Sequence, residues 1–546
     1  MRISNARHCK AGILGSLAAL VLGGLAQAQV PDVIVYDIGY DGANTNDFEY
    51  YGQNSGIAAY SFGTQSCNRG TTPVDWFDAG GDTRHPVIAQ NMFRLKDGRF
   101  EQLGQSWLKH GFCAVSETEA ECAPCLPDSG CDELGVGCAD TYWATLNDGG
   151  SGRSKRHVNA TMGTHVESAT GPAGNATIRG RLQVKVSDID PAQNPGAIYM
   201  AEGQYITADD AQAGVSSNNC SWRLLTVNSV SNITGGGPTN RQIPAIFAWQ
   251  EFDHQVVVKN VINPEAVGLK TLYYLAYRVT QVDADTWHYE YAIQNINSDQ
   301  SASSFSVPVH ANVPVQNIGF HDVEYHSGDP FNNTDWPGVE FGGEVRWAST
   351  ETFNQNPNAN ALRWGTMYNF RFDADSPPTD GPVTMGLFKP GPQTSLTVQA
   401  LIPTVLPHVP VDRKGTHSDP LAGSGGDVTV TLPMVADRPG SGVNPHVLSE
   451  LSPAVVGGLW RGKVAFEGST RTLLLVGRGA EGRLTRDGEL LLSGPLSGRV
   501  VTGEPTLFIP DDPALVGTTF TVQAAGLTAE GWRLSNALDV TVGADR

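Results

Sequence analysis

Closely spaced cysteines constrain the fold of this chain more than any other residue type. Five of its eight cysteines fall between residues 113 and 138, within a region rich in turn-forming residues. In an oxidising compartment such a cluster usually forms disulfides that brace a loop-rich region. If the thiols were kept reduced, the same cluster would suit a metal ion. We expect disulfides among Cys67, Cys113, Cys122, Cys125, Cys131, Cys138 and Cys220.

These seven cysteines follow a segment that is typical of an export signal. Residues 1–28 begin with three basic residues, continue with an apolar stretch at 11–25 and end with the small-residue pattern Ala26-Gln27-Ala28. We therefore expect a secreted, extracellular protein, with the periplasm as an alternative. No later segment has the apolar length of a membrane span. Because seven is an odd number, at least one cysteine should stay free, pair between chains or bind something else; the sequence does not give the pairing.

The chain is strongly acidic, which bears on its partners. Its formal net charge is −20, and removal of the predicted signal, with three basic and no acidic residues, makes it −23. Such a charge repels nucleic acid, so we expect no nucleic-acid partner. The sequence also contains no phosphate-binding glycine loop, so we expect no nucleotide cofactor.

Hydrophobic patterning predicts an all-β protein. The chain contains 62 glycines and 33 prolines, and its apolar residues alternate with polar ones over short segments. The clearest pattern is a hairpin, with strands at 271–282 and 286–296 around Asp283-Ala-Asp285. Further strands are expected at 32–38, 56–62, 87–95, 101–112, 177–186, 255–261, 304–309, 367–372 and 383–388, and near the C-terminus at 428–432, 458–466, 471–476, 489–492, 506–509, 519–525 and 534–540.

These segments predict three folded regions. An irregular, disulfide-stapled N-terminal region is expected at 29–175 and a central β-sandwich at 176–402. A Pro/Gly/Ser-rich linker at 403–427 would then lead to a small β domain at 428–546.

Four strings in the first two regions resemble a group of large secreted bacterial proteins of uncharacterised function. They are SFGTQSCN at 61–68, HPVIAQN at 85–91, GQSWLKHGF at 104–112 and RWGTMYNF at 363–370. The C-terminal segment resembles a small β module that is common in exported proteins. The resemblance implies an extracellular, multi-domain β protein, and it supplies no catalytic residue.

A first candidate metal site lies at 319–329. If this segment were extended, Asp322, Glu324 and His326 would share one strand face, close to His321. Such a set could hold zinc, manganese or copper with one position open to water. The alternative, a polar edge strand or loop facing solvent, is the commoner situation on a sandwich and is the one that we favour.

A second candidate set consists of histidines near the cysteine cluster, namely His85, His110, His157 and His165. Neutral imidazole is the commonest transition-metal ligand, and a mixture of His and Cys suits copper or zinc. His85 or His110 could also complete the site around His321. The wide spacing of these histidines leaves open whether they meet, and the alternative is that several of the twelve histidines after residue 28 lie near one another by chance.

An oxygen-rich loop near the N-terminus could bind calcium. Asp37, Asp41, Asn44 and Asp47 surround a glycine in a segment that does not fit the EF-hand pattern. The alternative is a loop of Asx-turns, in which the side-chain oxygens bind the loop's own backbone.

The sequence contains no recognised nucleophile motif. Six tryptophans lie in or beside the predicted sandwich, and exposed ones could stack on sugar rings, although most Trp side chains in sandwiches are core residues. We therefore expect a secreted binding or structural protein whose partner is an extracellular polymer or surface glycan. The alternative is an extracellular metal-dependent hydrolase or oxidoreductase that uses His, Asp and Glu side chains. The sequence does not indicate an oligomeric state. The six tryptophans in or beside the predicted sandwich are Trp222, Trp249, Trp287, Trp336, Trp347 and Trp364.

Overall fold

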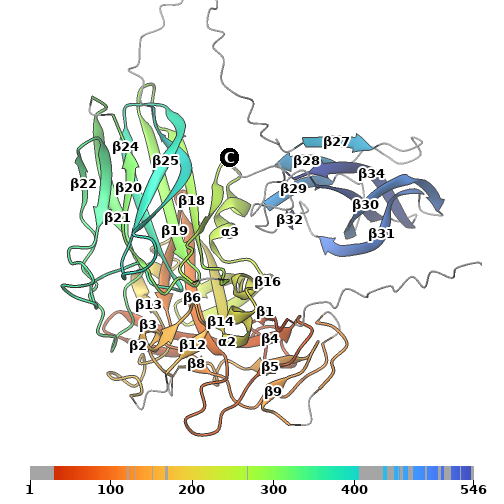
Figure 1. The fold of residues 1–546 in the computed structure, drawn as a ribbon, viewed down its shortest axis with the longest axis horizontal. Helices are drawn as coiled ribbons and strands as arrows, with labels where there is room; N and C mark the ends of the chain where they lie inside the picture. The colour runs from red at the N-terminus through yellow and green to blue at the C-terminus, as the bar shows by residue number, and fades with distance from the viewer. Residues whose placement is uncertain are drawn as a thin grey trace, which may run out of the picture.

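The computed structural model describes most of the chain between residues 30 and 404 and a set of segments between 434 and 542. The described residues are 30–119, 122–127, 130–149, 152–166, 170–266, 268–310, 312–404, 434–438, 448–452, 454, 459–464, 471–485, 488–501, 506–509, 518–528 and 531–542. The predicted export signal, nearly all of the predicted linker and the predicted strand at 428–432 lie outside them. Strands dominate the described residues, which confirms the all-β prediction (Figure 1).

A large antiparallel sheet organises the N-terminal half. Its strands run in the order β16-β15-β14-β6-β7-β13-β3-β2, and β8 pairs with the beginning of β6. The sheet contains strands from both sides of residue 175, where the sequence predicted a division. The strands are β2 (Phe48–Asn54), β3 (Ile57–Phe62), β6 (Val87–Lys96), β7 (Arg99–Gln105), β8 (Lys109–His110), β13 (Leu182–Lys185), β14 (Ile198–Ile206), β15 (Cys220–Ser229) and β16 (Asn232–Asn240).

The predicted strand at 177–186 is shorter in the structure and forms only β13. Gly180 has a φ of +78°, a left-handed conformation that interrupts an extended chain. The backbone N–H of Ile178 donates to the carbonyl of Asn175, so the preceding residues turn. The alternating pattern before Leu182 therefore belongs to a turn, and the chain continues after β13 into the short helix α1 (Val186–Ile189).

A three-stranded sheet covers one face of the large sheet, and disulfides brace it. It consists of β1 (Val33–Ile38), β4 (Thr64–Asn68) and β10 (Ala139–Tyr142) in the order β1-β4-β10. Apolar side chains of β1, β3, β6 and β14 form the core between the two sheets. The disulfides are Cys67–Cys122, Cys113–Cys131 and Cys125–Cys138, and Cys220 is free and buried.

Short elements complete this half of the molecule. Strand β5 (Val74–Asp75) pairs with β9 (Glu133–Leu134), and β11 (Val158–Asn159) pairs with β12 (Thr164–His165). The helical turns are η1 (Lys155–His157), α2 (Ala208–Gln212), η2 (Ser216–Asn218) and α3 (Ile246–Phe252).

Two five-stranded sheets form the predicted central β-sandwich (Figure 1). Their orders are β17-β18-β19-β24-β21 and β22-β23-β20-β25-β26, and an aromatic-rich core that includes Tyr291, Phe305 and Trp347 fills the space between them. The strands are β17 (Val257–Ile262), β18 (Leu272–Gln281), β19 (Trp287–Asn295), β20 (Ala302–Pro308), β21 (Val315–His321), β22 (Gly338–Phe341), β23 (Glu344–Ala348), β24 (Thr366–Ala374), β25 (Pro378–Leu387) and β26 (Ser395–Pro403).

The predicted hairpin is confirmed as β18 and β19. Its turn is held by the carboxylate of Asp283, which accepts hydrogen bonds from the backbone N–H groups of Asp285 and Thr286. Asp is favoured in such turns because its short side chain can bond the backbone two or three residues ahead.

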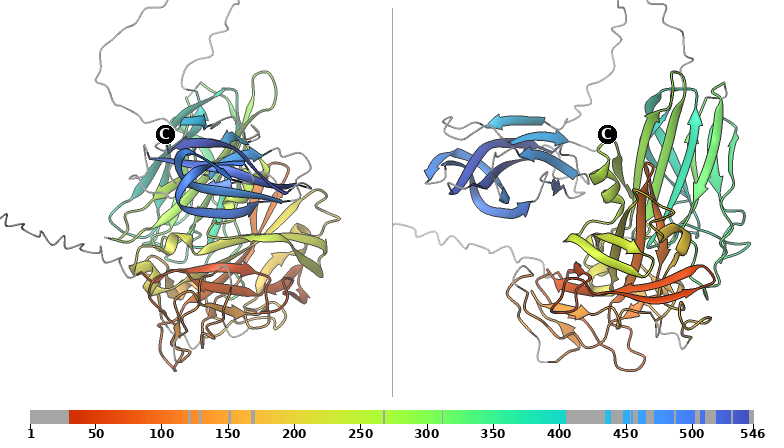
Figure 2. Two further views of the ribbon diagram at one scale, coloured as in Figure 1. Left: turned by 90° about the vertical axis from the view of Figure 1, so that its right-hand side faces the viewer. Right: turned by 180° about the vertical axis from the view of Figure 1, so that it is seen from behind.

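The second face of the β18–β19–β24 sheet packs on the large N-terminal sheet and α3, which joins the two halves (Figure 2). At this interface Glu202 is fully buried and accepts hydrogen bonds from Asn91 Nδ2 (3.0 Å), Gln294 Nε2 (2.8 Å) and the N–H of Ala245 (2.7 Å). Burial raises the pKa of this carboxyl. Donors from three separate segments therefore converge on one acidic group and set the register between the sheets.

The C-terminal segments form two antiparallel sheets around a small core that includes Trp460, Val522 and Leu538. Their orders are β27-β34-β33-β30-β31 and β28-β29-β32. No helix among the described residues is both long and apolar enough to cross a membrane. The strands are β27 (Met434–Arg438), β28 (Leu448–Ser452), β29 (Leu459–Val464), β30 (Arg471–Thr485), β31 (Gly488–Val501), β32 (Thr506–Phe508), β33 (Thr519–Thr528) and β34 (Gly531–Thr541).

The disulfide pattern predicts a thiol count. A protein that begins at residue 29 should show one free thiol, that of Cys220, after denaturation without reductant. Replacing Cys125 and Cys138 together with serine should lower the free energy of unfolding by about 3 kcal/mol, because their bridge closes a short loop in the unfolded chain. Thiol titration and urea unfolding measure the two effects. Two or more free thiols in the denatured wild type would contradict the pairing.

A histidine in the sandwich predicts a pH dependence of stability. His288 lies between Glu290 (Nε2–Oε2 3.1 Å) and Asp373 (Nδ1–Oδ1 2.6 Å). The hydrogen bond to Glu290 raises the pKa of His288, and the bond to Asp373 adds to this effect. The charged form thus contributes stability below about pH 6.5, the usual histidine pKa, and the contribution is lost as the pH rises through the folded-state pKa.

His288→Gln should consequently destabilise the protein more at pH 6 than at pH 8.5 in urea unfolding experiments. The exposed His254 offers a matched control, because His254→Gln should give no such difference. An equal loss of stability for His288→Gln at both pH values would show that the two carboxylates do not hold a charged imidazole.

Candidate metal centre

Three histidines from separate segments meet beside the beginning of β6. His85 precedes β6 by two residues, and His110 ends β8, where it pairs with Val87. His165 lies in β12, where it pairs with Val158 of β11. The antiparallel register of two short ladders therefore brings the three imidazoles together, although 80 residues separate the first from the last.

The three rings approach each other through nitrogen atoms. His85 Nε2 lies 3.0 Å from His110 Nδ1 and 3.2 Å from His165 Nε2. One ligand nitrogen of each ring lies within 4.8 Å of the others. In tetrahedral zinc sites, with Zn–N bonds of 2.0–2.1 Å, neighbouring ligand nitrogens are about 3.3 Å apart. The two shorter separations are therefore close to those of nitrogens that share one metal ion.

Hydrogen bonding orients the central ring. His85 Nδ1 lies 2.7 Å from the carbonyl oxygen of Phe77, so this nitrogen carries the proton and donates. In the neutral ring Nε2 then carries the lone pair and points at the other two imidazoles. A backbone carbonyl that fixes the tautomer of a histidine in this way is a usual outer partner of metal ligands.

Burial keeps the three imidazoles neutral, which is the form that binds metals. It lowers the pKa of His85, and burial together with the neighbouring imidazoles lowers the pKa of His110 to about 3. Burial, followed by the effect of His85, lowers the pKa of His165 to about 4. At neutral pH the cluster therefore holds three uncharged rings, the form of histidine that binds metal ions.

In the metal-free protein, the lone pair of His85 Nε2 can accept hydrogen bonds from both His110 Nδ1 and His165 Nε2. That arrangement leaves the outer nitrogens, His110 Nε2 and His165 Nδ1, without a hydrogen-bond partner among the described residues, although both are buried. Buried polar atoms without partners cost about 1–3 kcal/mol each. An ion held by the inner nitrogens would leave these two outer nitrogens unpaired as well, so they do not distinguish the metal-bound cluster from the metal-free one.

A cavity of about 250 Å³ opens beside the three rings. Its walls include Lys109 and Arg153 as well as Asp78 and Asp82. Burial lowers the pKa of Lys109 to about 8, and its Nζ lies 4.2 Å from the centre of the Phe112 ring. A metal held by the three nitrogens would have a fourth position free, and this cavity offers room for the ligand that fills it.

Of the four N-terminal histidines considered in the sequence, His157 does not join the cluster. Its Nε2 accepts a hydrogen bond from Nε of Arg156 (3.1 Å).

The sequence contains one signal for the meeting of His85 and His110. Counted along the sequence, they lie at nearly equal distances from the turn at Asp97-Gly98, which joins β6 to β7.

The structure does not bring together the four residues of the first candidate site. Strand β21 ends at His321, so the alternation expected for residues 322–326 does not apply, because these residues are not extended in a ladder. His321 Nε2 contacts the carbonyl of Gln102 (3.2 Å), and Glu324 pairs with Lys185 (2.6 Å).

The other two residues of that site are also occupied by protein groups. Burial raises the pKa of Asp322 to about 6, and its carboxylate accepts from the amide of Asn360. His326 is buried, with its ring nitrogens facing the carbonyls of Ser327 (2.7 Å) and Arg181 (3.0 Å). Neither ring nitrogen of His326 is directed at a neighbouring carboxylate or histidine.

The oxygen-rich loop has the hydrogen bonds of an Asx-turn. Asp41 accepts from the backbone N–H groups of Ala43 and Asn44 and from the Asn44 amide. Asp47 accepts from the N–H of Ala144, and Asp37 pairs with Arg241 at 3.4 Å. These three carboxylates therefore have protein partners, and they do not form a three-ligand cluster within the part of the chain that the structure describes.

The tryptophans considered for glycan binding are mostly core residues. Trp287 is half-buried and packs against the sandwich core. The other five, none more than 4% exposed, are Trp222, Trp249, Trp336, Trp347 and Trp364.

No family model matches the chain, and no curated protein matches it. A solved structure of Escherichia coli alpha-2-macroglobulin activated by porcine elastase is similar at 9% sequence identity and a TM-score of 0.10. The match covers 94% of this chain and 35% of that one, so the chain spans about a third of that structure's length. Similarity at this level supports no assignment.

The neutral histidine cluster predicts acid sensitivity of the metal-free protein. Because the folded-state pKa values lie below the usual value of about 6.5, the unfolded chain binds more protons between pH 6.5 and 4. In EDTA, stability should fall on acidification through this range, by up to about 1.4 kcal/mol per pH unit for each excluded proton. His165→Gln should make the fall shallower in urea unfolding, and His254→Gln should not. Identical slopes for wild type and His165→Gln would contradict the neutral cluster.

Proposed function

We propose that this protein is an exported metalloprotein and that His85, His110 and His165 bind one divalent transition-metal ion. Zinc is the first choice, because three histidines with an open fourth position form the coordination of hydrolytic zinc sites. The observation that carries the proposal is the convergence of three neutral ring nitrogens, with separations of 3.0 and 3.2 Å from the central ring. The predicted export signal and the three disulfides support an oxidising, extracellular location.

The chemistry that best fits this centre is hydrolysis. Zinc lowers the pKa of a bound water to about 7, which supplies hydroxide at neutral pH. The adjoining cavity would give a substrate access to an ion held by the three histidines, and Lys109 and Arg153 on its wall would attract a developing negative charge. An extracellular metal-dependent hydrolase is therefore the activity that we propose, in preference to an oxidoreductase.

Binding of an extracellular polymer through exposed tryptophans has less support. Five of the six tryptophans that suggested it have almost no exposed surface, so they cannot stack on a sugar ring without unfolding of the core. The metal-dependent alternative instead has a preformed cluster of ligand atoms.

Metal content tests the proposal. Purified protein that begins at residue 29, after EDTA treatment, dialysis and exposure to zinc, should retain about one ion per chain, measured by elemental analysis. His110→Ala should retain none, because two histidines leave the ion with too few protein ligands. His254→Ala should behave as wild type, since His254 is exposed and lies outside the cluster. Equal zinc retention by His110→Ala and wild type would overturn the proposed site.

Hydrolysis is tested separately from binding. Zinc-loaded wild type should cleave p-nitrophenyl acetate with a rate that rises with pH and levels off above about 7, as the bound water ionises. The rate for His110→Ala should be at least about 100-fold lower than for wild type, because this variant does not retain the ion. If wild type binds zinc stoichiometrically but cleaves the ester no faster than His110→Ala does, the centre is not hydrolytic. Tighter binding of copper with reduction of the bound ion would then favour the oxidoreductase.

A further inference from the structure

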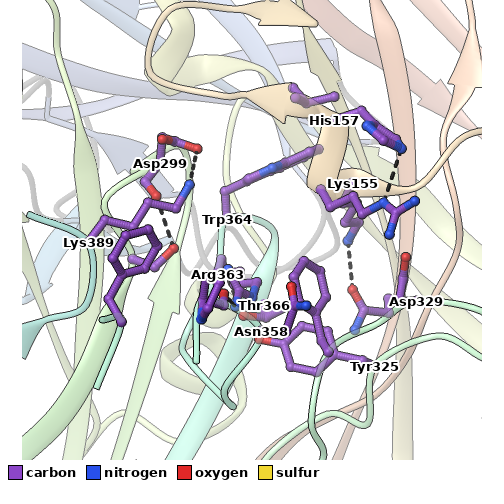
Figure 3. A pocket seen from close by; sticks show the side chains of 17 residues that line it. Lys155, His157, Asp299, Tyr325, Asp329, Asn358, Arg363, Trp364, Thr366 and Lys389 are labelled. Carbon is purple, nitrogen blue, oxygen red and sulfur yellow. Dashed lines mark hydrogen bonds and ion pairs between the residues drawn. The ribbon is translucent and has the colours of Figure 1, made fainter. Parts of the chain in front are cut away.

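A second cavity lies between the N-terminal half and the central sandwich. Its volume is about 340 Å³, within the range of small-molecule sites. It is lined from one side by η1 and the beginning of β11, and from the other by loops of the sandwich around Tyr325, Asn358 and Trp364. Figure 3 shows the labelled side chains around this space, with Lys155 and the Asp299–Lys389 pair on opposite sides of Trp364.

The cavity has an excess of positive charge, although the protein as a whole is acidic. The cavity wall contains four Lys and Arg side chains and two Asp side chains. Asp299 is paired with Lys389 at 2.8 Å. Asp329 accepts hydrogen bonds from the hydroxyl of Ser154 and from the indole N–H of Trp107 (3.1 Å). Both carboxylates are thus satisfied by protein donors.

Lys155 is the buried cation of this wall, with 8% of its surface exposed. Its Nζ donates to neutral oxygens, those of Gln105 (Oε1, 3.1 Å), Asn91 (Oδ1, 3.4 Å) and Gly365 (carbonyl, 3.4 Å). Among the described residues no carboxylate lies within ion-pair distance of it. Burial lowers the pKa of Lys155 to about 8, and the more distant carboxylates of Glu202 and Asp329 offset only part of this effect.

Arg363 is a second cation without an acidic partner on this wall. Its Nη2 donates to the carbonyls of Pro357 and Ala359, both at 3.0 Å, and its guanidinium lies 3.8 Å from the centre of the Phe331 ring. Its Nε is buried and has no hydrogen-bond partner in the part of the chain that the structure describes. Two cations without carboxylate partners on one cavity wall favour an anionic occupant.

The rest of the wall favours a ring that carries hydroxyl groups. Phe331 and Phe353 line the cavity and are only half-buried, so they offer aromatic surface on which the C–H face of a sugar ring can pack. The half-buried Asn358 also lines the cavity, and its side-chain amide can exchange hydrogen bonds with hydroxyls, whereas the hydroxyls of Ser301 and Thr366 already donate to backbone carbonyls. A purely aromatic acid has no hydroxyl group for the Asn358 amide, whereas a carboxylated sugar matches both sets of contacts.

We propose that this cavity binds an acidic sugar unit, with the sugar carboxylate near Lys155 and Arg363 and the ring near the half-buried Phe331 and Phe353. Binding here involves none of the three histidines, so the proposal stands independently of the metal centre. It identifies the extracellular ligand class as uronate-containing glycans and places the contact inside a cavity between the two halves of the protein.

Ligand-observed NMR titrations of the protein that begins at residue 29 test the proposal, with glucuronate and galacturonate as probes. At least one of the two should bind saturably with a Kd of about 1 mM or tighter, and at least tenfold more tightly than glucose or benzoate. Raising the salt concentration should weaken uronate binding, because salt screens the attraction between the sugar carboxylate and the two cations of the cavity. Failure of both uronates to bind, or equal binding of glucose, would overturn the assignment.

Variants locate the site. Lys155→Met should weaken uronate binding at least tenfold, and Lys96→Met, which removes the same charge from a lysine outside the cavity wall, should leave it unchanged. Equal effects of the two substitutions would contradict the role of Lys155. If Lys155→Met does not fold, as judged by circular dichroism, the comparison of uronate with glucose on wild type still decides the question. EDTA-treated and zinc-loaded protein should bind uronate equally, which separates this outcome from the test of the metal centre.

Discussion

Both sites depend on one small apolar cluster at the junction of the large sheet, β11 and the sandwich. Val87, Leu108, Val158 and Trp364 are buried together there, with Ala89, Ala160 and Ile206. Burial of an aliphatic side chain of this size contributes about 1.5–3 kcal/mol, so the cluster fixes the position of each segment firmly. Val87 and Val158 are also the ladder partners of His110 and His165. The packing that holds these valines therefore sets the geometry of the histidine cluster.

The same cluster shapes the larger cavity. Val158 and Trp364 line that cavity, and Lys155 precedes Val158 in the same turn of chain. Lys155 Nζ lies 5.4 Å from the centre of the Trp364 ring, so the lysine reaches back over the apolar cluster toward the sandwich. A substitution that loosens this packing would consequently disturb both sites, whereas changes at the ligand atoms should affect one site at a time.

Much of the fold follows from local chemistry, and this part was predictable. The β18–β19 hairpin has alternating strands and an aspartate that bonds its own turn, so its period and its boundary were both visible in the sequence. The free Cys220 agrees with an odd number of cysteines. The extent of β13 was not predictable, because an alternating pattern does not reveal that Gly180 adopts a left-handed conformation.

The candidate sites show the corresponding limit. His321 and its neighbours looked like a ligand set because they are close in sequence, but β21 ends at His321 and the later residues find separate partners. His85, His110 and His165 are far apart in sequence, and their meeting depends on the registers of two short ladders. Those registers are set by the tertiary packing of apolar residues, and nothing in the sequence of these residues indicates a metal site. The second cavity likewise requires contacts between segments about 200 residues apart, such as that of Lys155 with Gly365.

The most direct test of the metal centre is anomalous diffraction from crystals of zinc-loaded protein, recorded on both sides of the zinc absorption edge. The account predicts one strong anomalous peak about 2.0–2.1 Å from His85 Nε2, His110 Nδ1 and His165 Nε2, with a further ligand on the cavity side. A map with no anomalous peak among the three rings, and with the imidazoles hydrogen-bonded directly to one another, would contradict the proposed metal centre.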